Sequence, residues 1–304
     1  MFVIDTHCDS IDRGMHGECA YAPYNMSAEH LQFMACYTDR PGMTPEESWQ
    51  LLCAMRAELK AQTEKYPGLL ALCRTVSEAK AAVAAGKKAM FFAMEGAQAL
   101  DGKAERLDEV CADGLRCVSL TWNQNNLYGC ANPFSGTAQD TGLTAAGIEL
   151  VRECGRRGVL VDVSHASDAT TMDILRTSTL PVLATHSDFR EVAAHNRNLT
   201  REQALAIRDS GGVIGFNLCL PFLGGEHIES LLPHLEYALE TVGEDASCFG
   251  CDIDGIDTYP AGLSLDSSLH EQMLEFLRGR GYGEELLYKL ACGNVLRVLE
   301  TVCP

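Results

Sequence analysis

The stretch Val3-Ile4-Asp5-Thr6-His7-Cys8-Asp9 joins an apolar start to a histidine and two acids. Successive side chains of a β-strand point to opposite faces, so an ideal strand here places Asp5, His7 and Asp9 on one face. An imidazole and a carboxylate that arrive together at the end of a strand suit a divalent metal ion. The alternative is a surface strand of mixed polarity, and the rest of the chain has to decide between the two.

The remainder of the sequence predicts a series of strands of which this stretch is the first. Eight short runs are predicted to be strands, at residues 3–8, 69–74, 89–95, 117–122, 159–165, 182–187, 212–218 and 248–254. Most are nearly continuous apolar runs, which is typical of parallel strands buried on both faces. Segments with helical periodicity lie between them, among them residues 45–66, 76–85, 145–157, 201–209 and 228–242.

Strands that alternate with helices over the whole length predict a parallel α/β fold. Eight such strands fit a single, somewhat distorted (β/α)8 barrel of the TIM type, with residues 1–304 as one domain. A doubly wound open sheet is the alternative fold. That alternative is disfavoured because no glycine-rich phosphate turn follows the first predicted strand.

The composition excludes several classes of protein. The chain is 46% hydrophobic and 22% charged, as ordinary globular proteins are. The net charge is -18 and no cluster of Lys and Arg occurs, so a nucleic-acid partner is not expected. No apolar run reaches the length of a membrane helix, and no basic segment followed by an apolar stretch opens the chain. We therefore expect no membrane partner, no signal peptide and a cytoplasmic location.

Fourteen cysteines are scattered at irregular spacings. In a chain without an export signal, reduced thiols that pack as small hydrophobes are the expected state. Cys248 and Cys251 form a CxxC pair of the kind found in redox and zinc sites. No second CxxC completes a zinc site, and positions three apart face opposite sides of a strand, so two packing thiols are predicted.

Side chains that can bind metals recur at the ends of five predicted strands. In chain order they are His7 and Asp9, Glu95, His165, His186, and finally Asp252 and Asp254. Because active sites of (β/α)8 barrels lie at the C-terminal ends of the strands, we expect these side chains to meet. The other histidines are predicted to be hydrogen-bonded surface residues of loops and helices: His16, His30, His195, His227, His234 and His270.

Any one of these strand-end residues has a simple explanation as a loop anchor. Jointly, three imidazoles and several carboxylates buried around one axis carry a heavy desolvation cost unless something compensates for it. A pair of divalent cations, with one carboxylate bridging them, compensates naturally. Two zinc ions suit this set of nitrogen and oxygen donors, and manganese, cobalt or iron also fit by ligand type.

The order of these motifs resembles the membrane dipeptidase family, also called renal dipeptidase, among the amidohydrolase-like metal-dependent barrels. The likeness runs nearly from end to end. The stretches that carry it are IDTHCD (residues 4–9), MEGA (94–97), SLTWN (119–123), VDVSH (161–165), ATHS (184–187), NRNL (196–199), GFN (215–217), GCDIDG (250–255) and GNVLR (293–297).

The resemblance implies a ligand set for two zinc ions. His7 and Asp9 would bind one ion, and His165 and His186 would bind the other. Glu95 would bridge the two ions and so belong to the catalytic set.

The resemblance also implies how substrate is held and protonated. Arg197 would hold the substrate carboxylate, whereas without the resemblance it reads as a surface arginine. Asp252 would transfer protons, and an exchange of roles with Asp254 stays open because both point the same way in an ideal strand. Trp122 stands where mammalian members have a histidine that contacts the scissile peptide. Tryptophan is neither an acceptor nor a charged donor, so oxyanion stabilisation would fall more heavily on the metal.

Together these features predict a binuclear zinc dipeptidase that hydrolyses small dipeptides, including L,D-dipeptides, by attack of a metal-bridged hydroxide. The resemblance further implies a homodimer. Two alternatives stay open. One is a related amidohydrolase-type barrel that acts on another amide, a lactone or a phosphoester, and the other is a metal-binding barrel without catalysis.

Overall fold

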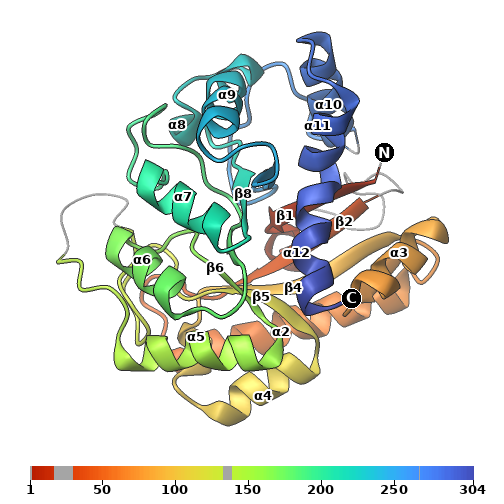
Figure 1. The fold of residues 1–304 in the computed structure, drawn as a ribbon. Coiled ribbons are helices and arrows are strands. Elements are labelled where there is room, and N and C mark those ends of the chain that lie inside the picture. The colour runs from red at the N-terminus through yellow and green to blue at the C-terminus, as the bar shows by residue number, and fades with distance from the viewer. Residues whose placement is uncertain (1, 17–29, 133–138, 267) are drawn as a thin grey trace.

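The computed structural model describes residues 2–16, 30–132, 139–266 and 268–304. Within these residues nine parallel strands form one sheet, and eight of them close into a barrel surrounded by helices (Figure 1). In order around the ring they are β1 (Val3–Cys8), β2 (His30–Tyr37), β4 (Lys88–Glu95), β5 (Leu115–Ser119), β6 (Leu160–Asp162), β7 (Val182–Ala184), β8 (Val213–Phe216) and β9 (Ser247–Phe249). Because β9 pairs with β1, the ring is closed, and the predicted (β/α)8 barrel is confirmed.

The second strand of the barrel is not the one that was predicted. Strand β3 (Leu70–Cys73) pairs only with residues 88–91 of β4, while β5 takes residues 92–95, so β3 lies outside the ring. The prediction that residues 69–74 form a barrel strand is therefore wrong, and β2 fills that place. In β2 the polar His30 and Gln32 alternate with Leu31 and Phe33, which pack in the barrel interior. A search for long continuous apolar runs passes over a strand whose first half alternates in this way.

The strands of the second half of the chain end earlier than predicted. Strands β6, β7 and β9 stop before the polar residues that were expected at their ends. His165, Asp252 and Asp254 have positive φ angles of 70°, 57° and 65°. Such angles interrupt a strand and are tolerated best by residues of this short polar kind. The polar side chains are consequently carried by tight turns just beyond the strands.

Helices connect the strands around the outside of the barrel. Their bounds are α1 (Ser10–Met15), α2 (Pro45–Lys65), α3 (Val76–Ala84), α4 (Ala104–Ala112), α5 (Ala145–Arg157), α6 (Asp168–Thr177), α7 (Arg201–Asp209), α8 (Leu220–Leu223), α9 (Leu231–Thr241), α10 (Leu269–Gly279), α11 (Glu284–Tyr288) and α12 (Asn294–Val302). Helices α2 and α7 begin where predicted because Thr44 and Thr200 each accept an N–H of the first turn, in full capping boxes. The helix predicted over 228–242 divides into a 3-10 turn, Ile228–Ser230, and α9.

Helix α12 covers the end of the barrel where the strands begin. Its Val295 and Val298 share a buried cluster with the inward residues Ile4, Leu31 and Phe91. In Figure 1 this helix crosses in front of the strands. With that end filled, the opposite end, where the strands finish, is the one that can open to substrate.

Three histidines that were expected at the surface are buried. His30 lies on β2, His234 on α9 and His270 on α10. The His234 ring accepts the Phe189 N–H and donates to the Leu223 carbonyl, and burial lowers its pKa to about 4. For His234 and His270 the expectation failed because a place within a helix does not tell which face of that helix packs on the barrel. For His30 it failed because β2 was not predicted. His16 and His227 are exposed, as expected.

The cysteines within the described residues are all free thiols, and most of them are buried, as predicted. Cys19 lies outside the described residues. Cys248 and Cys251 contact different neighbours, Thr6 and His270 respectively, so they do not form a pair.

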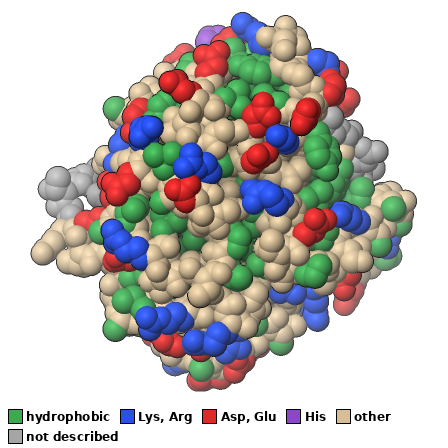
Figure 2. Space-filling view, viewed as in Figure 1, with side chains coloured by type: hydrophobic (Ala, Val, Ile, Leu, Met, Phe, Trp, Pro, Cys, Tyr) green, Lys and Arg blue, Asp and Glu red, His purple; other side chains and the backbone are tan. Residues whose placement is uncertain are grey.

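The surface carries both signs of charge. On the face shown in Figure 2, Lys and Arg side chains are interspersed with Asp and Glu. Across the part of the chain that the structure describes, no helix combines the length and the apolar character that a membrane crossing requires.

Candidate active site

A cavity of about 800 Å³ opens where the barrel strands finish. Its walls include the predicted residues Asp9, Glu95, Arg197 and Asp252, together with the aromatic ring of Trp122. The predicted substrate and proton-transfer residues therefore border the same space as the predicted metal ligands.

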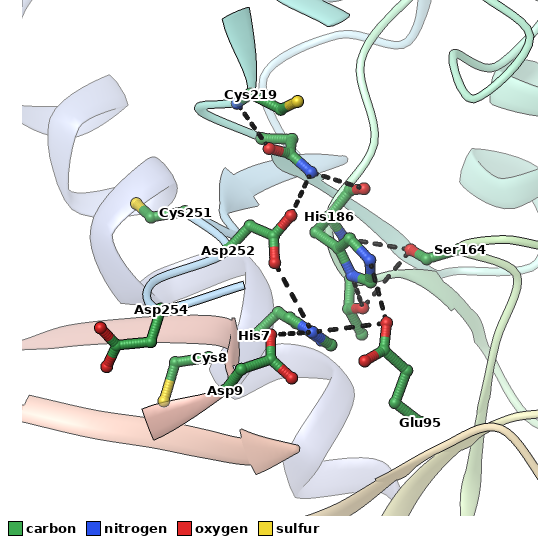
Figure 3. A network of polar contacts seen from close by, with 12 residues as sticks. His7, Cys8, Asp9, Glu95, Ser164, His186, Cys219, Cys251, Asp252 and Asp254 are labelled. Carbon is green, nitrogen blue, oxygen red and sulfur yellow. Dashed lines mark hydrogen bonds and ion pairs between the residues drawn. The ribbon is translucent and has the colours of Figure 1, made fainter. Parts of the chain in front are cut away.

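Glu95 lies at the centre of the predicted metal ligands. Its Oε1 is 2.9 Å from His165 Nε2, 3.6 Å from His186 Nε2 and 3.7 Å from His7 Nε2. His7 Nε2 is 3.3 Å from Asp9 Oδ2, and the two Nε2 atoms of His165 and His186 are 2.9 Å apart. Figure 3 shows His7, Asp9, Glu95 and His186 converging in this way. The five predicted ligands thus come from the ends of four strands, β1, β4, β6 and β7, to one place.

Burial and mutual charge interactions shift the pKa values of these groups in opposite directions. Burial lowers the pKa of His165 and of His186 well below the ordinary value. For His7, burial acts in the same direction, but the carboxylates of Glu95, Asp9 and Asp252 outweigh it and raise the pKa to about 10. Burial, reinforced by Asp9, raises the pKa of Glu95 well above its ordinary value. A carboxyl group that resists ionisation beside two imidazoles that stay neutral is a pattern that a divalent cation relieves.

Two buried atoms of the cluster have no hydrogen-bond partner within the described residues, namely His7 Nε2 and Asp9 Oδ1. His7 is 4% exposed and Asp9 is 7% exposed, so water does not readily satisfy them. An imidazole nitrogen and a carboxylate oxygen are the donors that zinc and related ions take. The donor set therefore fits a metal centre at this position.

The two rings beside Glu95 are oriented by partners at their far nitrogen. His165 Nδ1 is 2.8 Å from Asn123 Oδ1, and His186 Nδ1 is 2.8 Å from Thr185 Oγ1. Thr185 Oγ1 in turn donates to Asp162 Oδ2 at 2.7 Å. With Nδ1 protonated, each Nε2 keeps its lone pair toward Glu95, which a metal ligand requires.

Asp252 and Asp254 face different surroundings, although the sequence alone could not tell them apart. Asp252 Oδ1 is 3.9 Å from His7 Nε2, and Asp252 Oδ2 accepts a hydrogen bond of 3.0 Å from Asn217 Nδ2. Asp254 instead accepts from Ser10 Oγ at 2.6 Å, and its carboxylate points away from His7 in Figure 3. The expectation that both point the same way is wrong because β9 ends at Phe249 and both acids lie in a turn.

The turn that carries these acids passes very close to the cluster. A Cβ atom at Gly255 would lie 2.2 Å from Asp252 Oδ1 and 2.3 Å from Asp9 Oδ2. Only glycine lets the chain follow this path, which explains the final glycine of the stretch GCDIDG.

Arg197 is a buried arginine of the cavity wall, not a surface residue. It is 3% exposed, its guanidinium lies over the Phe222 ring, and its contacts to Ser187 Oγ and the His186 carbonyl are long, at 3.5 and 3.4 Å. Its Nε has no partner within the described residues. Trp122 forms the neighbouring wall, with its ring centre 4.7 Å from that of Tyr37 and 5.9 Å from that of His165.

Comparisons with known proteins agree with this geometry. The sequence pattern described as "Membrane dipeptidase (Peptidase family M19)" matches residues 9–303. The chain belongs to the membrane dipeptidase family. A Klebsiella pneumoniae protein described as an uncharacterized protein in the pqqA 5′ region is 34% identical over 86% of this chain and 98% of that protein. The dipeptidase verJ of Clonostachys rogersoniana is 30% identical over 79% of this chain and 62% of that protein.

A solved structure is similar over the whole length. The metallo peptidase of Rhodobacter sphaeroides, liganded with a phosphinate mimic of the dipeptide L-Ala-D-Ala, superposes with a TM-score of 0.89 and 28% identity, covering 99% of each chain. Membership in the family makes the present chain a metal-dependent dipeptide hydrolase.

Several residues that shape this dipeptidase site were not singled out from the sequence. Asn123, Asn217 and the pair Asp162 and Thr185 stand in the quoted motifs, but local order does not tell which ring nitrogen or carboxylate each contacts. Asp5 was expected on the same face of the strand as His7 and Asp9, and this expectation is wrong. The pairing of β1 with β2 shifts register between Asp5 and Cys8, so the Asp5 carboxylate contacts His270 of α10 instead.

The Asn123–His165 contact predicts a change in metal affinity. Replacing Asn123 with Ala should weaken zinc binding by about 10- to 100-fold, because His165 loses the acceptor that fixes its ring. Asn123→Asp keeps an acceptor oxygen and should stay close to the unmodified protein. Competition with a chromophoric chelator measures both, with Gln124→Ala as the control because Gln124 contacts the backbone near Asp39 and not a histidine. Equal affinity in Asn123→Ala would contradict the orienting role.

Proposed function

We propose that this dipeptidase holds two zinc ions and hydrolyses small dipeptides, L,D-dipeptides among them. His7 and Asp9 would hold one ion, His165 and His186 would hold the other, and Glu95 would be shared between them. The observation that carries the proposal is that one oxygen, Glu95 Oε1, faces three imidazole Nε2 atoms at 2.9 to 3.7 Å. The unpartnered His7 Nε2 and Asp9 Oδ1 support it.

The proposal also covers the extent of the catalytic domain, the cellular location and the oligomeric state. Barrel strands begin at residue 3, and α12 covers the barrel near residue 302, which supports one catalytic domain over residues 1–304. The free thiols of the described cysteines support a reducing, cytoplasmic location. A homodimer rests on the family likeness alone, and no step of catalysis below requires it.

Asp252 is the proposed proton-transfer group. When bound, divalent ions acidify water and withdraw electrons from the scissile carbonyl. Burial raises the pKa of Asp252 to about 6, which is near the range where a carboxylate both accepts and returns a proton at neutral pH. Asn217 holds one of its oxygens and leaves the other toward His7 and the cavity. From there Asp252 takes the proton of the attacking water and delivers it to the leaving amine.

Arg197 is the proposed clamp for the substrate carboxylate. A planar guanidinium matches a carboxylate with two parallel hydrogen bonds. The long contacts of its Nη atoms and the unpartnered Nε leave donors available at the cavity wall. Such a clamp selects a substrate whose free carboxylate lies one residue beyond the scissile bond, as it does in a dipeptide.

The rest of the cavity supports a small substrate with modest side chains. Trp122 and Tyr37 make one wall, and Leu220, Pro221 and Phe222 make another. The dipeptide mimic bound by the Rhodobacter sphaeroides relative ends in D-Ala, which supports acceptance of L,D-dipeptides here. Trp122 has no charged donor to offer the scissile carbonyl, so its proposed role is packing against substrate.

Metal removal tests the function directly. Dialysis against a strong chelator should abolish hydrolysis of Ala-Ala and of L-Ala-D-Ala, and zinc should restore it because the site donors remain in place. Metal content per chain is measured alongside the rates. Full activity at vanishing metal content would exclude a metal-dependent reaction, and restored metal without hydrolysis of any dipeptide in a panel would exclude the proposed substrate class.

The clamp predicts a dependence on the substrate carboxylate. Arg197→Ala should lower kcat/KM for Ala-Ala by about 10- to 100-fold, because a charge-assisted pair is lost. The C-terminal amide of the same dipeptide should be much less affected, since it offers no carboxylate. Arg197→Lys keeps the charge but not the fork and should fall between, and the exposed Arg201→Ala is the surface control. An equal loss of kcat/KM on both substrates would contradict the assignment of Arg197 as the clamp.

The two acids of the turn give a matched pair for proton transfer. Asp252→Asn should lower kcat by about 10²- to 10⁴-fold with little change in KM. Asp254→Asn should have a much smaller effect, because Asp254 faces Ser10 and not the cluster. Asn tolerates the positive φ of both positions, so the turn is preserved. A larger loss of kcat in Asp254→Asn than in Asp252→Asn would reverse the assignment.

A further inference from the structure

A second group of metal-binding side chains lies away from the cavity, between the barrel wall and α10. It comprises Asp5 of β1, Cys251 just after β9, and His270 of α10. One ligand atom from each lies within 4.8 Å of the others, and none of the three side chains is more than 4% exposed. His270 Nε2 is 2.6 Å from Asp5 Oδ2 and 3.6 Å from Cys251 Sγ.

This group is separate from the candidate active site. In Figure 3 the Cys251 side chain points away from the cluster that Asp252 faces. Cys251 Sγ contacts Met273 Sδ, on the same helix as His270, at 3.8 Å. The Asp5 carboxylate and the His7 ring likewise serve different clusters although only Thr6 separates them.

A fourth buried side chain, that of His30, lies beside this group. His30 of β2 is 1% exposed, and its ring meets the His270 ring edge to face with centres 4.4 Å apart. Neither of its ring nitrogens has a hydrogen-bond partner within the described residues. A neutral imidazole always carries one N–H donor and one acceptor, so burying both unpaired is unfavourable unless an additional partner arrives.

Hydrogen bonds already fix the orientation of the Asp5 carboxylate, as a metal ligand requires. Asp5 Oδ1 accepts the His7 N–H at 3.0 Å and the Gln32 amide at 3.3 Å, and the Cys251 N–H lies 3.3 Å from both oxygens. These donors orient the carboxylate and leave Oδ2 directed at His270. Hydrogen bonds to the non-ligating oxygen are typical of carboxylates that bind metals.

From this geometry we infer that Asp5, Cys251 and His270 bind one further zinc-class divalent ion, next to the buried ring of His30. On a tetrahedral zinc, a thiolate sulfur and an imidazole nitrogen lie about 3.6 Å apart, given the usual bond lengths. The Cys251–His270 distance of 3.6 Å matches this separation. A carboxylate oxygen and an imidazole nitrogen lie about 3.3 Å apart on zinc, so the Asp5–His270 pair opens slightly when the ion enters.

Ion binding changes the protonation of this group in a defined way. The proton between His270 Nε2 and Asp5 is displaced, and the Cys251 thiol loses its proton to solvent. The bound ion joins α10 to the start of the turn that carries Asp252 and to the strand that carries His7. Its role is therefore structural, and it needs no open coordination position.

The test uses cobalt(II) as a probe of thiolate ligation. The proposed active-site ligands are nitrogen and oxygen donors, so only the new site gives a cobalt–thiolate charge-transfer band in the near ultraviolet. The full chain is stripped with chelator, kept reduced with a phosphine, and titrated with cobalt(II). We expect the band in the unmodified protein, its loss in Cys251→Ser, and its persistence in Cys248→Ser and in the cavity variant Cys219→Ser.

Zinc content gives an independent measurement on protein purified with added zinc. The unmodified protein should hold one zinc ion per chain more than Cys251→Ser. This difference does not depend on how many ions the active site holds, so failure of the binuclear proposal and failure of this one are distinguishable. His270→Gln, which keeps a donor toward Asp5, should lose the same ion and serves if Cys251→Ser does not fold.

Two results would overturn the inference. The first is the absence of a thiolate band in the unmodified protein at saturating cobalt(II). The second is equal zinc content in the unmodified protein, Cys251→Ser and His270→Gln. Either result would leave Asp5 and His270 as a hydrogen-bonded pair only.

Discussion

Charge compensation at the open end of the barrel is the constraint on which the rest of the structure depends. Glu95 is 4% exposed, and three imidazoles face one of its oxygens. Without cations, His7 competes for a proton while burial keeps His165 and His186 neutral. Bound cations would favour the ionised form of Glu95 and the neutral form of each imidazole, which would remove the conflict. The surrounding turns hold these groups together. Without charge compensation they would have no reason to share one buried volume.

Tight turns, more than strands, give the site its geometry. His165 and Asp252 both have positive φ angles, and Gly255 passes where a side chain would collide with Asp252 and Asp9. Backbone strain of this kind is maintained only where surrounding contacts determine it. The barrel supplies those contacts by fixing where each strand stops. A few residues after each strand ends, a turn directs one functional side chain toward Glu95.

The sequence was sufficient for the barrel and for the residues that gather at its rim, because both rest on local patterns. Apolar runs ending in His or an acid mark strand ends, and strand ends of a barrel share one rim. It was insufficient where the answer depends on register or on a turn. The first half of strand β2 alternates polar and apolar residues. Asp254 turns away because β9 ends early, and Asp5 changes side through a register shift. His270 was placed at the surface because a helical position does not reveal the packed face.

Two buried aspartates show how the barrel braces the ligands. Asp162 Oδ1 accepts the N–H groups of Ser164 and Thr185, which immediately precede His165 and His186. Asp5 does the same for the other half of the site, since it accepts the N–H of His7 and that of Cys251, the neighbour of Asp252. Each carboxylate thus ties two adjacent turns into one unit.

The second oxygen distinguishes these two aspartates. In Asp162 it accepts from the Thr185 hydroxyl, which also contacts His186, so the whole carboxylate serves the site. In Asp5 it is directed outward to His270 on α10. To tie two adjacent turns together, each aspartate needs only the oxygen that accepts the backbone N–H groups. The outward contact therefore calls for a separate explanation, and the thiol of Cys251 and the unpartnered ring of His30 beside it indicate that this explanation is chemical and not merely one of packing.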